Sequence, residues 1–189
     1  MPFTVLVLGV AVVIGYLRGG RLSRIAEGVG WSWLLLVGLA LQVAVDAAAA
    51  RGQLPSLVGT GLLVASQLLV AVWAVLNRFR PGMPLILLGL LLNAVVLVAN
   101  GAMPVAPEAI AAIGLPGVEP ISGKHEIMTG HSRLPYLADI VPLPPLRTIV
   151  SLGDIVLGAG LIPLLSHLMS YRTPSERRGG RRRPLPEHP

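Results

Sequence analysis

An aspartate lies near the start of the last long apolar run of the chain, in the stretch SLGDIVLGAG at residues 151–160. Ionisable residues within membrane-spanning segments are costly, and they tend to be functional and to face the bundle interior. Asp154 and Asp46 are the only acidic residues that fall within the apolar runs. We therefore expect each carboxylate to need a hydrogen-bonding partner, a counter-charge or a proton.

Amide side chains accompany these carboxylates. At a helical rise of about 1.5 Å per residue, Asp46 lies about 22 Å along its run, in the outer half of a membrane. Gln42 is one turn away on the same face, and Asn93 and Asn100, seven residues apart, share a face of another run. Hydrogen bonding between helices is the alternative interpretation of such amides. Their shared depth, from mid-membrane to the outer leaflet, favours a pocket.

The position of Asp154 depends on where its helix begins. A start near Pro144 and Pro145, which suit a first turn, places Asp154 about 13 Å inside the helix. A start at Ile155 makes Asp154 the N-cap instead. The second placement leaves about 24 Å of helix up to Ser170, which is short for a hydrocarbon core of about 30 Å. We therefore favour the buried placement.

The segment 101–145 is rich in Pro and Gly and too long for a simple connection. Its apolar residues predict that it is ordered, because a solvated linker would not need them. It supplies the remaining pocket candidates, which are Lys124, His125, Arg133 and Asp139.

The motif KHEIMTGH within this segment spaces His125 and His131 six residues apart. Zinc proteases instead place two histidines four residues apart on one helix face. We therefore expect no metal site, and no pattern in the chain indicates a cofactor.

Composition identifies the class of protein. The 189 residues are 53% hydrophobic and only 13% charged, about half the charged fraction of a soluble domain. Five apolar runs, about 3–18, 31–50, 55–76, 83–100 and 146–170, approach the length of about 17–25 residues that crosses a bilayer. The first run has no positive residue before it, so we expect a retained span rather than a secretory signal. The chain has no cysteine.

Basic residues predict the orientation. Three arginines follow the first run, two follow the third and six lie in the tail, which places eleven of the fifteen basic residues on one side. The positive-inside rule assigns that side to the cytoplasm. The high pI of about 11.0 therefore reflects topology, and we expect no nucleic-acid partner. The partners expected are the lipid bilayer and other membrane proteins.

The predicted fold is an all-α bundle of five transmembrane helices with the N-terminus outside and the C-terminus inside. Residues 1–171 form the bundle with its outer segment 101–145, and residues 172–189 form a disordered basic tail in the cytoplasm.

Three stretches, NGAMPV at 100–105, LPYLADIVPLP at 134–144 and SLGDIVLGAG at 151–160, resemble an uncharacterised family of small bacterial membrane proteins, known as a domain of unknown function. The resemblance covers nearly the whole chain except the tail. It implies a bacterial plasma membrane location and a multi-pass protein, and it implies no activity.

Asp139 and Asp154 also lie in an arrangement similar to that of lipoprotein signal peptidases, which use two aspartates near the outer membrane face. This similarity implies an aspartic peptidase in which the two carboxylates share one proton and activate water. Ser151 and Gly153 replace the Asn and Ala of that family's last motif. Ser151 also departs from the G-x-G-D motif of intramembrane aspartyl proteases.

Three functions follow from these residues. The leading one is binding or handling of a small ligand or lipid in an outward-facing polar pocket formed by Asp46, Asn100, Lys124, His125, Arg133, Asp139 and Asp154. The second is the aspartic peptidase with Asp139 and Asp154 as catalytic residues. The third is a structural subunit whose polar residues only join helices.

Overall fold

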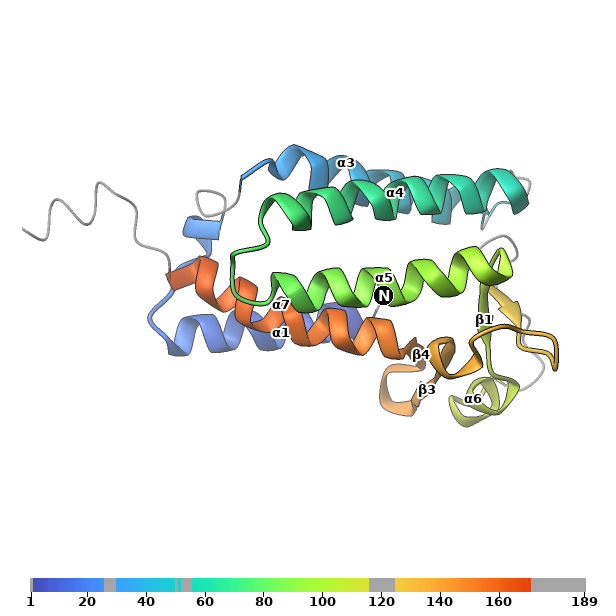
Figure 1. The fold of residues 1–189 in the computed structure, drawn as a ribbon. Coiled ribbons are helices and arrows are strands. Elements are labelled where there is room, and N and C mark those ends of the chain that lie inside the picture. Colours follow the sequence, from blue (N-terminus) through green and yellow to red (C-terminus); the bar gives the residue numbers. More distant parts are fainter. Residues whose placement is uncertain (1, 26–29, 50, 52–55, 116–124, 171–189) are drawn as a thin grey trace, which may run out of the picture.

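Five long helices form the body of the protein in the computed structural model, which describes residues 2–25, 30–49, 51, 56–115 and 125–170. Two of them, α3 (Ser32–Ala49) and α4 (Ser56–Leu76), pack side by side and form one layer (Figure 1). The other three form a second layer in which α7 contacts both neighbours; they are α1 (Pro2–Leu17), α5 (Met83–Asn100) and α7 (Leu152–Ser170). A short 3-10 turn, η1 (Leu22–Arg24), follows α1.

The ends of α5 are set by glycines. Gly82 and Gly101 flank the helix with φ values of 86° and 82°, in the left-handed region that glycine enters without steric cost. The N–H of Gly101 donates to the carbonyl of Leu97 at 2.8 Å, which satisfies a carbonyl in the last turn. Pro84 occupies the first turn, where its missing N–H costs nothing.

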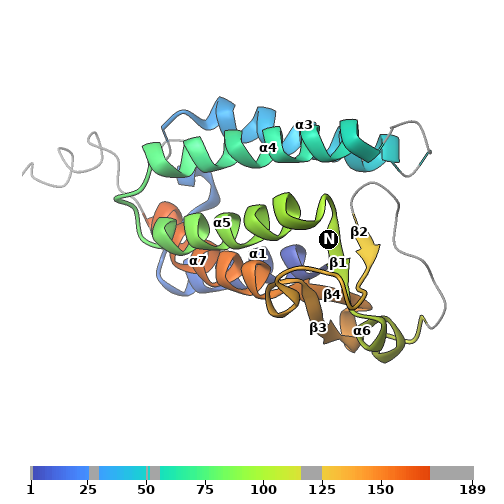
Figure 2. The ribbon, with the colours of Figure 1, turned by 45° about the vertical axis from the view of Figure 1, so that its right-hand side comes forward.

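A small mixed sheet lies at one end of the helices (Figure 2). Its strand order is β2-β1-β3-β4, with β1 parallel to β2 and β3, and β3 antiparallel to β4. The strands are β1 (Met103–Val105), β2 (His125–Ile127), β3 (Asp139–Leu143) and β4 (Thr148–Ser151). The short helix α6 (Pro107–Ala112) and the 3-10 turns η2 (Pro135–Leu137) and η3 (Pro144–Leu146) connect them.

The strand register brings distant residues together. Asp139 on β3 pairs with Val105 on β1 and with Ser151 on β4, and His125 on β2 pairs with Met103 on β1. Because β4 ends at Ser151 and α7 begins at Leu152, the sheet delivers the chain directly into the first turn of α7.

Two apolar clusters hold the layers together. One includes Leu34, Trp73 and Leu90, and the other consists of Val45, Leu63 and Leu97. Each of α3, α4 and α5 contributes residues to both clusters and carries an amide side chain between these residues along the helix. The three amide residues are Gln42 on α3, Gln67 on α4 and Asn93 on α5. The interior is therefore apolar at two levels, with a polar level between them.

The prediction of an all-α bundle of five spans is wrong. The described chain has six α-helices and a four-stranded mixed sheet, so the fold is α/β. By length and composition, two described helices can cross a membrane, Met83–Asn100 and Leu152–Ser170, whereas the other apolar helical stretches are shorter. The strands were missed because they are three to five residues long, and three residues are too few for alternation to show. The tail 172–189 lies outside the described residues.

Candidate functional site

The four residues Ser151–Asp154 form the N-cap and the first turn of α7. The N–H of Asp154 donates to Ser151 Oγ at 3.0 Å, and the N–H of Ser151 donates to Asp154 Oδ2 at 3.2 Å. This reciprocal pairing is a capping box, in which Ser151 is the N-cap and Asp154 is the third helical residue. The side chain lies in the first turn of α7, where an acidic residue stabilises a helix through the helix dipole.

Asn93 of α5 completes this network. Its Nδ2 donates to Asp154 Oδ1 at 2.8 Å, and Ser151 Oγ donates to Asn93 Oδ1 at 2.9 Å. Asn93 and Ser151 are buried, and Asp154 is partly buried. The three side chains therefore join α5 to the junction of β4 and α7 through satisfied hydrogen bonds, as burial of polar groups requires.

Gly153 makes this approach possible. A Cβ at this position would collide with Asn93 Oδ1 and would lie 2.9 Å from the carbonyl oxygen of Gly89. The absence of a side chain lets α5 and α7 pack closely enough for the amide to reach the carboxylate, as small residues do where helices cross.

Both placements proposed for Asp154 are therefore corrected. The helix begins at Leu152, neither at Pro144 nor at Ile155, because residues 139–151 form a hairpin of β3 and β4 that uses the prolines in a turn. Asp154 takes part in capping and also lies inside the molecule. Its carboxylate accepts a hydrogen bond from Asn93 Nδ2.

A second polar pair lies on the sheet. His125 Nε2 is 3.5 Å from Asp139 Oδ2, and the two residues come from β2 and β3, on either side of β1. The side chain of Asp139 is 9% exposed, whereas the side chain of His125 is 29% exposed. A buried carboxylate requires such a partner. The pair is charge-assisted when the imidazole is protonated.

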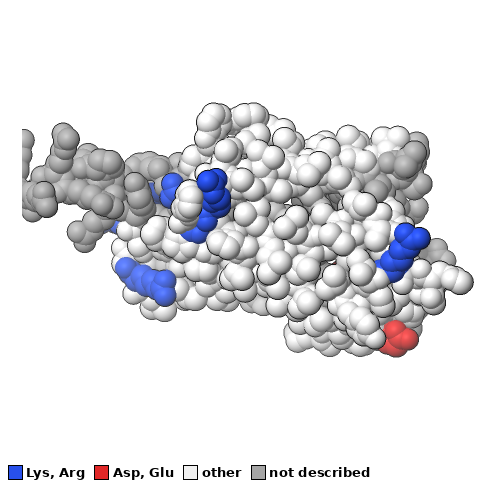
Figure 3. Space-filling view, in the orientation of Figure 1, with Lys and Arg blue, Asp and Glu red and all other residues white. Residues whose placement is uncertain are grey.

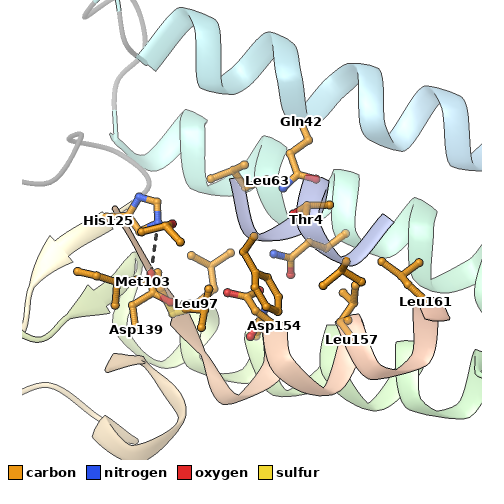
Figure 4. A pocket seen from close by; sticks show the side chains of 18 residues that line it. Thr4, Gln42, Leu63, Leu97, Met103, His125, Asp139, Asp154, Leu157 and Leu161 are labelled. Carbon is orange, nitrogen blue, oxygen red and sulfur yellow. Dashed lines mark hydrogen bonds and ion pairs between the residues drawn. The ribbon is translucent and has the colours of Figure 1, made fainter. Parts of the chain in front are cut away.

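The Asn93–Asp154 pair and the His125–Asp139 pair both face one cavity of about 300 Å³ (Figure 4). Its walls come from α1, α3, α4, α5, α7 and all the strands from β1 to β4. Apolar side chains form part of the lining, including Leu63, Leu97 and Leu157. The polar lining residues are Thr4, Gln42, Gln67, Asn93, His125, Asp139, Thr148 and Asp154. Small-molecule sites have this combination of size, apolar walls and a few convergent polar groups.

One polar atom of the lining stands out. Gln67 Oε1 is buried and has no hydrogen-bond partner among the described residues. An unpaired buried acceptor costs about 1–3 kcal/mol, so its presence in a native structure calls for an explanation. A bound molecule that donates to this oxygen would supply one.

The structure brings three of the predicted site residues together in the cavity and places two others outside it. Asp139, Asp154 and His125 line the cavity together. Asn100 and Arg133 are paired elsewhere: the N–H of Arg133 donates to Asn100 Oδ1 at 2.7 Å, and Asn100 Nδ2 donates to the carbonyl of Arg133 at 3.0 Å. Asn100 is therefore a clamp on the chain that leads into η2, and neither residue contributes to the cavity lining.

Lys124 lies outside the described residues, as does the side chain of Asp46, whose backbone belongs to α3. Sequence reasoning missed Gln67, Thr4 and Thr148. Gln67 carried a usable signal, because a glutamine within the apolar run 55–76 is as unusual as Gln42 in the preceding run.

The chemistry of the two aspartates also differs. A carboxylate dyad acts by sharing one proton between adjacent oxygens. Here Asp139 faces His125, whereas Asp154 accepts hydrogen bonds from Asn93 and Ser151. Among the described residues, no group of three or more His, Cys, Asp or Glu side chains is placed to hold a metal ion.

Comparison with known families matches residues 28–166 of the chain to the model of a family of unknown function, DUF5317. The chain belongs to the DUF5317 family. The resemblance found in the sequence to an uncharacterised family is thus confirmed. No curated protein matches the chain, and no solved structure does.

The DUF5317 match includes most of the cavity wall. The residues from Gln42 to Leu161 fall within it, and only the α1 contribution, Phe3, Thr4 and Val7, lies before residue 28. The capping box, Asn93 and the pair of His125 and Asp139 are all within the matched segment. The cavity is therefore lined mainly by residues of the segment that matches the DUF5317 model.

Proposed function

We propose that this protein is an integral membrane protein that binds a small polar ligand, or the polar headgroup of a lipid, in the cavity between its two helical layers and its sheet. The observation that carries this proposal is a cavity of about 300 Å³ in which a buried glutamine oxygen has no partner among the described residues. Sites for small molecules begin at about this size.

Surface composition supports a membrane location. The helices expose many large apolar side chains, among them Val5, Leu17, Leu36 and Val98, each at least 65% exposed. Extensive exposed apolar surface marks contact with lipid or with protein partners. We place α5 and α7 across the plasma membrane, with the other apolar helices packed beside them. That this membrane is a bacterial one is a prediction from the family resemblance.

Charge supports the orientation. Arg18, Arg21, Arg24, Arg78 and Arg80 lie at the end of the helices remote from the sheet, where the N–H of Arg21 donates to the carbonyl of Met169 at the end of α7. On the face drawn in Figure 3, most of the visible basic side chains lie toward that end, and a further basic patch lies toward the sheet. By the positive-inside rule this end is cytoplasmic, so the sheet and the cavity face the exterior.

Binding explains the site better than the two rival functions. A peptidase needs paired carboxylates, but Asp139 and Asp154 engage different partners. A purely structural role would leave the polar groups fully paired between helices, and Gln67 does not fit that description.

The proposal can be tested with single cysteines, because the chain has none of its own. Thr148→Cys places a thiol in the cavity lining, and Thr129→Cys places one on an exposed residue outside it. In the purified full chain, both should react with the neutral reagent 2-hydroxyethyl methanethiosulfonate. A library of small polar compounds is then screened for a raised Tm, since a ligand of the native state stabilises it.

A true ligand should raise Tm and slow the labelling of Thr148→Cys without affecting Thr129→Cys. A cysteine at 148 that fails to react in the folded protein, while Thr129→Cys reacts normally, would show that the cavity is closed to small molecules and would overturn the proposal.

A further inference from the structure

Resting on the proposed function, we infer that the cavity selects a ligand that carries a positively charged ammonium group with N–H donors. The first observation is the charge of the lining. Its ionisable members are Asp139, Asp154 and His125, and no lysine or arginine is among the described lining residues. Even with the imidazole protonated, these three side chains carry one net negative charge with both carboxylates ionised.

The negative charge that matters most is on Asp154. Within the described chain, its carboxylate accepts hydrogen bonds from Asn93 Nδ2 and the N–H of Ser151, which are both neutral donors. These bonds and the dipole of α7 orient the carboxylate, but no cationic side chain of the described chain is bonded to it. In the reduced dielectric of a cavity, a cation gains more from such a charge than it does in water.

The second observation is independent of charge. Gln67 Oε1, on the α4 wall, is a buried acceptor without a partner in the described structure. Asp154, on the α7 wall, has lone pairs beyond those used by its two donors. A primary ammonium group brings three N–H donors and no acceptor, so it matches acceptors on the walls. An anion or a pure acceptor would meet repulsion at Asp154 and leave Gln67 unpaired.

The lining also limits the rest of the ligand. Leu63, Leu97, Leu157 and Leu161 provide apolar contact for a short carbon chain. Two sources have this chemistry: a small soluble amine, and an ethanolamine headgroup of a membrane lipid.

The inference is tested by labelling Thr148→Cys with three reagents that differ only in their end group: 2-aminoethyl, 2-hydroxyethyl and 2-sulfonatoethyl methanethiosulfonate. Each rate is divided by the rate of the same reagent at Thr129→Cys. We expect the cationic reagent to exceed the anionic one by about tenfold or more after this correction, since clefts of one sign concentrate ions of the opposite sign by such factors.

Two cavity variants and one control variant show which residues cause this difference in labelling rate. Asp154→Asn should reduce the corrected ratio several-fold and leave the neutral reagent's rate at position 148 nearly unchanged. The matched control Glu108→Gln removes an exposed carboxylate on α6 that does not line this cavity, and it should leave the ratio unchanged. Gln67→Leu keeps every charge, so it should preserve the ratio while weakening protection by an amine.

Protection from the neutral reagent identifies the source of the ligand. Slower labelling of Thr148→Cys in dissolved ethanolamine indicates a soluble amine. Slower labelling only in vesicles of phosphatidylethanolamine, compared with phosphatidylglycerol, indicates a lipid headgroup.

Equal corrected rates for the cationic and anionic reagents, or no protection by either amine source, would overturn the inference alone. Absence of labelling by all three reagents at position 148 would instead refute the proposed binding function.

Discussion

Asp154 shows how one side chain can serve both folding and function. Its Oδ2 takes part in the capping box with Ser151, and its Oδ1 accepts from Asn93, so the carboxylate is fixed before any ligand arrives. Groups held in place by such surrounding bonds give the accurate geometry that binding sites need.

The cap itself predicts a stability change. Ser151→Ala removes the hydroxyl that accepts from the N–H of Asp154 and donates to the buried Asn93 Oδ1. Loss of an N-cap costs about 1 kcal/mol, and an orphaned buried acceptor costs about 1–3 kcal/mol more. We expect a clearly lower Tm in thermal unfolding. Ser151→Thr keeps the hydroxyl and is the control; equal Tm values for Ser151→Ala and wild type would contradict the network.

Gly153 predicts a steric effect at the crossing of α5 and α7. Gly153→Ala adds a methyl group that collides with the Asn93 amide, and overpacking of this kind costs about 1–3 kcal/mol. Gly9→Ala in α1 is a matched control, because nothing lies within 4 Å of a Cβ built there. Thermal unfolding should separate the two variants, with only Gly153→Ala destabilised. An unchanged Tm for Gly153→Ala would contradict the close packing of α5 against α7 at this position.

At the scale of elements, two asparagines act as clamps at opposite ends of the helices. Asn100 binds both backbone groups of Arg133. Asn77 likewise accepts from the N–H of Gly30 at 3.3 Å and donates to its carbonyl at 3.1 Å. Each clamp fixes a connecting segment to a helix end by pairing backbone groups that would otherwise need water.

The clamps predict local changes in hydrogen exchange. Asn100→Ala should speed exchange of the Arg133 amide and its neighbours in η2, because local opening then breaks fewer bonds. Asn77→Ala is the reciprocal control, which should affect Gly30 and leave residues 131–137 unchanged. Unaltered exchange at Arg133 in Asn100→Ala would show that the sheet, rather than this clamp, holds the segment.

At the scale of the whole molecule, the polar residues Gln42, Gln67 and Asn93 lie between two apolar clusters, and the sheet lies at one end of the helices. The proposed orientation makes this end extracytoplasmic and the arginine-rich end cytoplasmic.

This orientation predicts the outcome of labelling in intact cells with a membrane-impermeant thiol reagent. Thr129→Cys, exposed near the sheet, should be labelled, and Ser23→Cys, exposed in η1 among the arginines, should react only after the membrane is permeabilised. The reverse pattern would invert the topology. Reaction at both positions in sealed cells would argue against a membrane barrier between them.

The sequence by itself determined the apolar helices and the family, and it predicted that Asp154 needs a partner. Long runs of apolar residues and the breakers between them are local signals, and they located α3, α4 and α5 closely. The presence of Asp154 in such a run showed that it needs a partner, because burial of a carboxylate is costly wherever the run is placed.

Only the tertiary structure decided which partner that is and where the helix begins. The pairing of Val105 with Asp139, and of Met103 with His125, joins segments distant along the chain, and strands of three to five residues carry no periodic signal that reveals it. The pairing of β3 with β4 starts α7 at Leu152 and brings Asn93 to Asp154 across Gly153. Partners in space depend on how the layers pack, and packing is a property of the whole chain rather than of any one run.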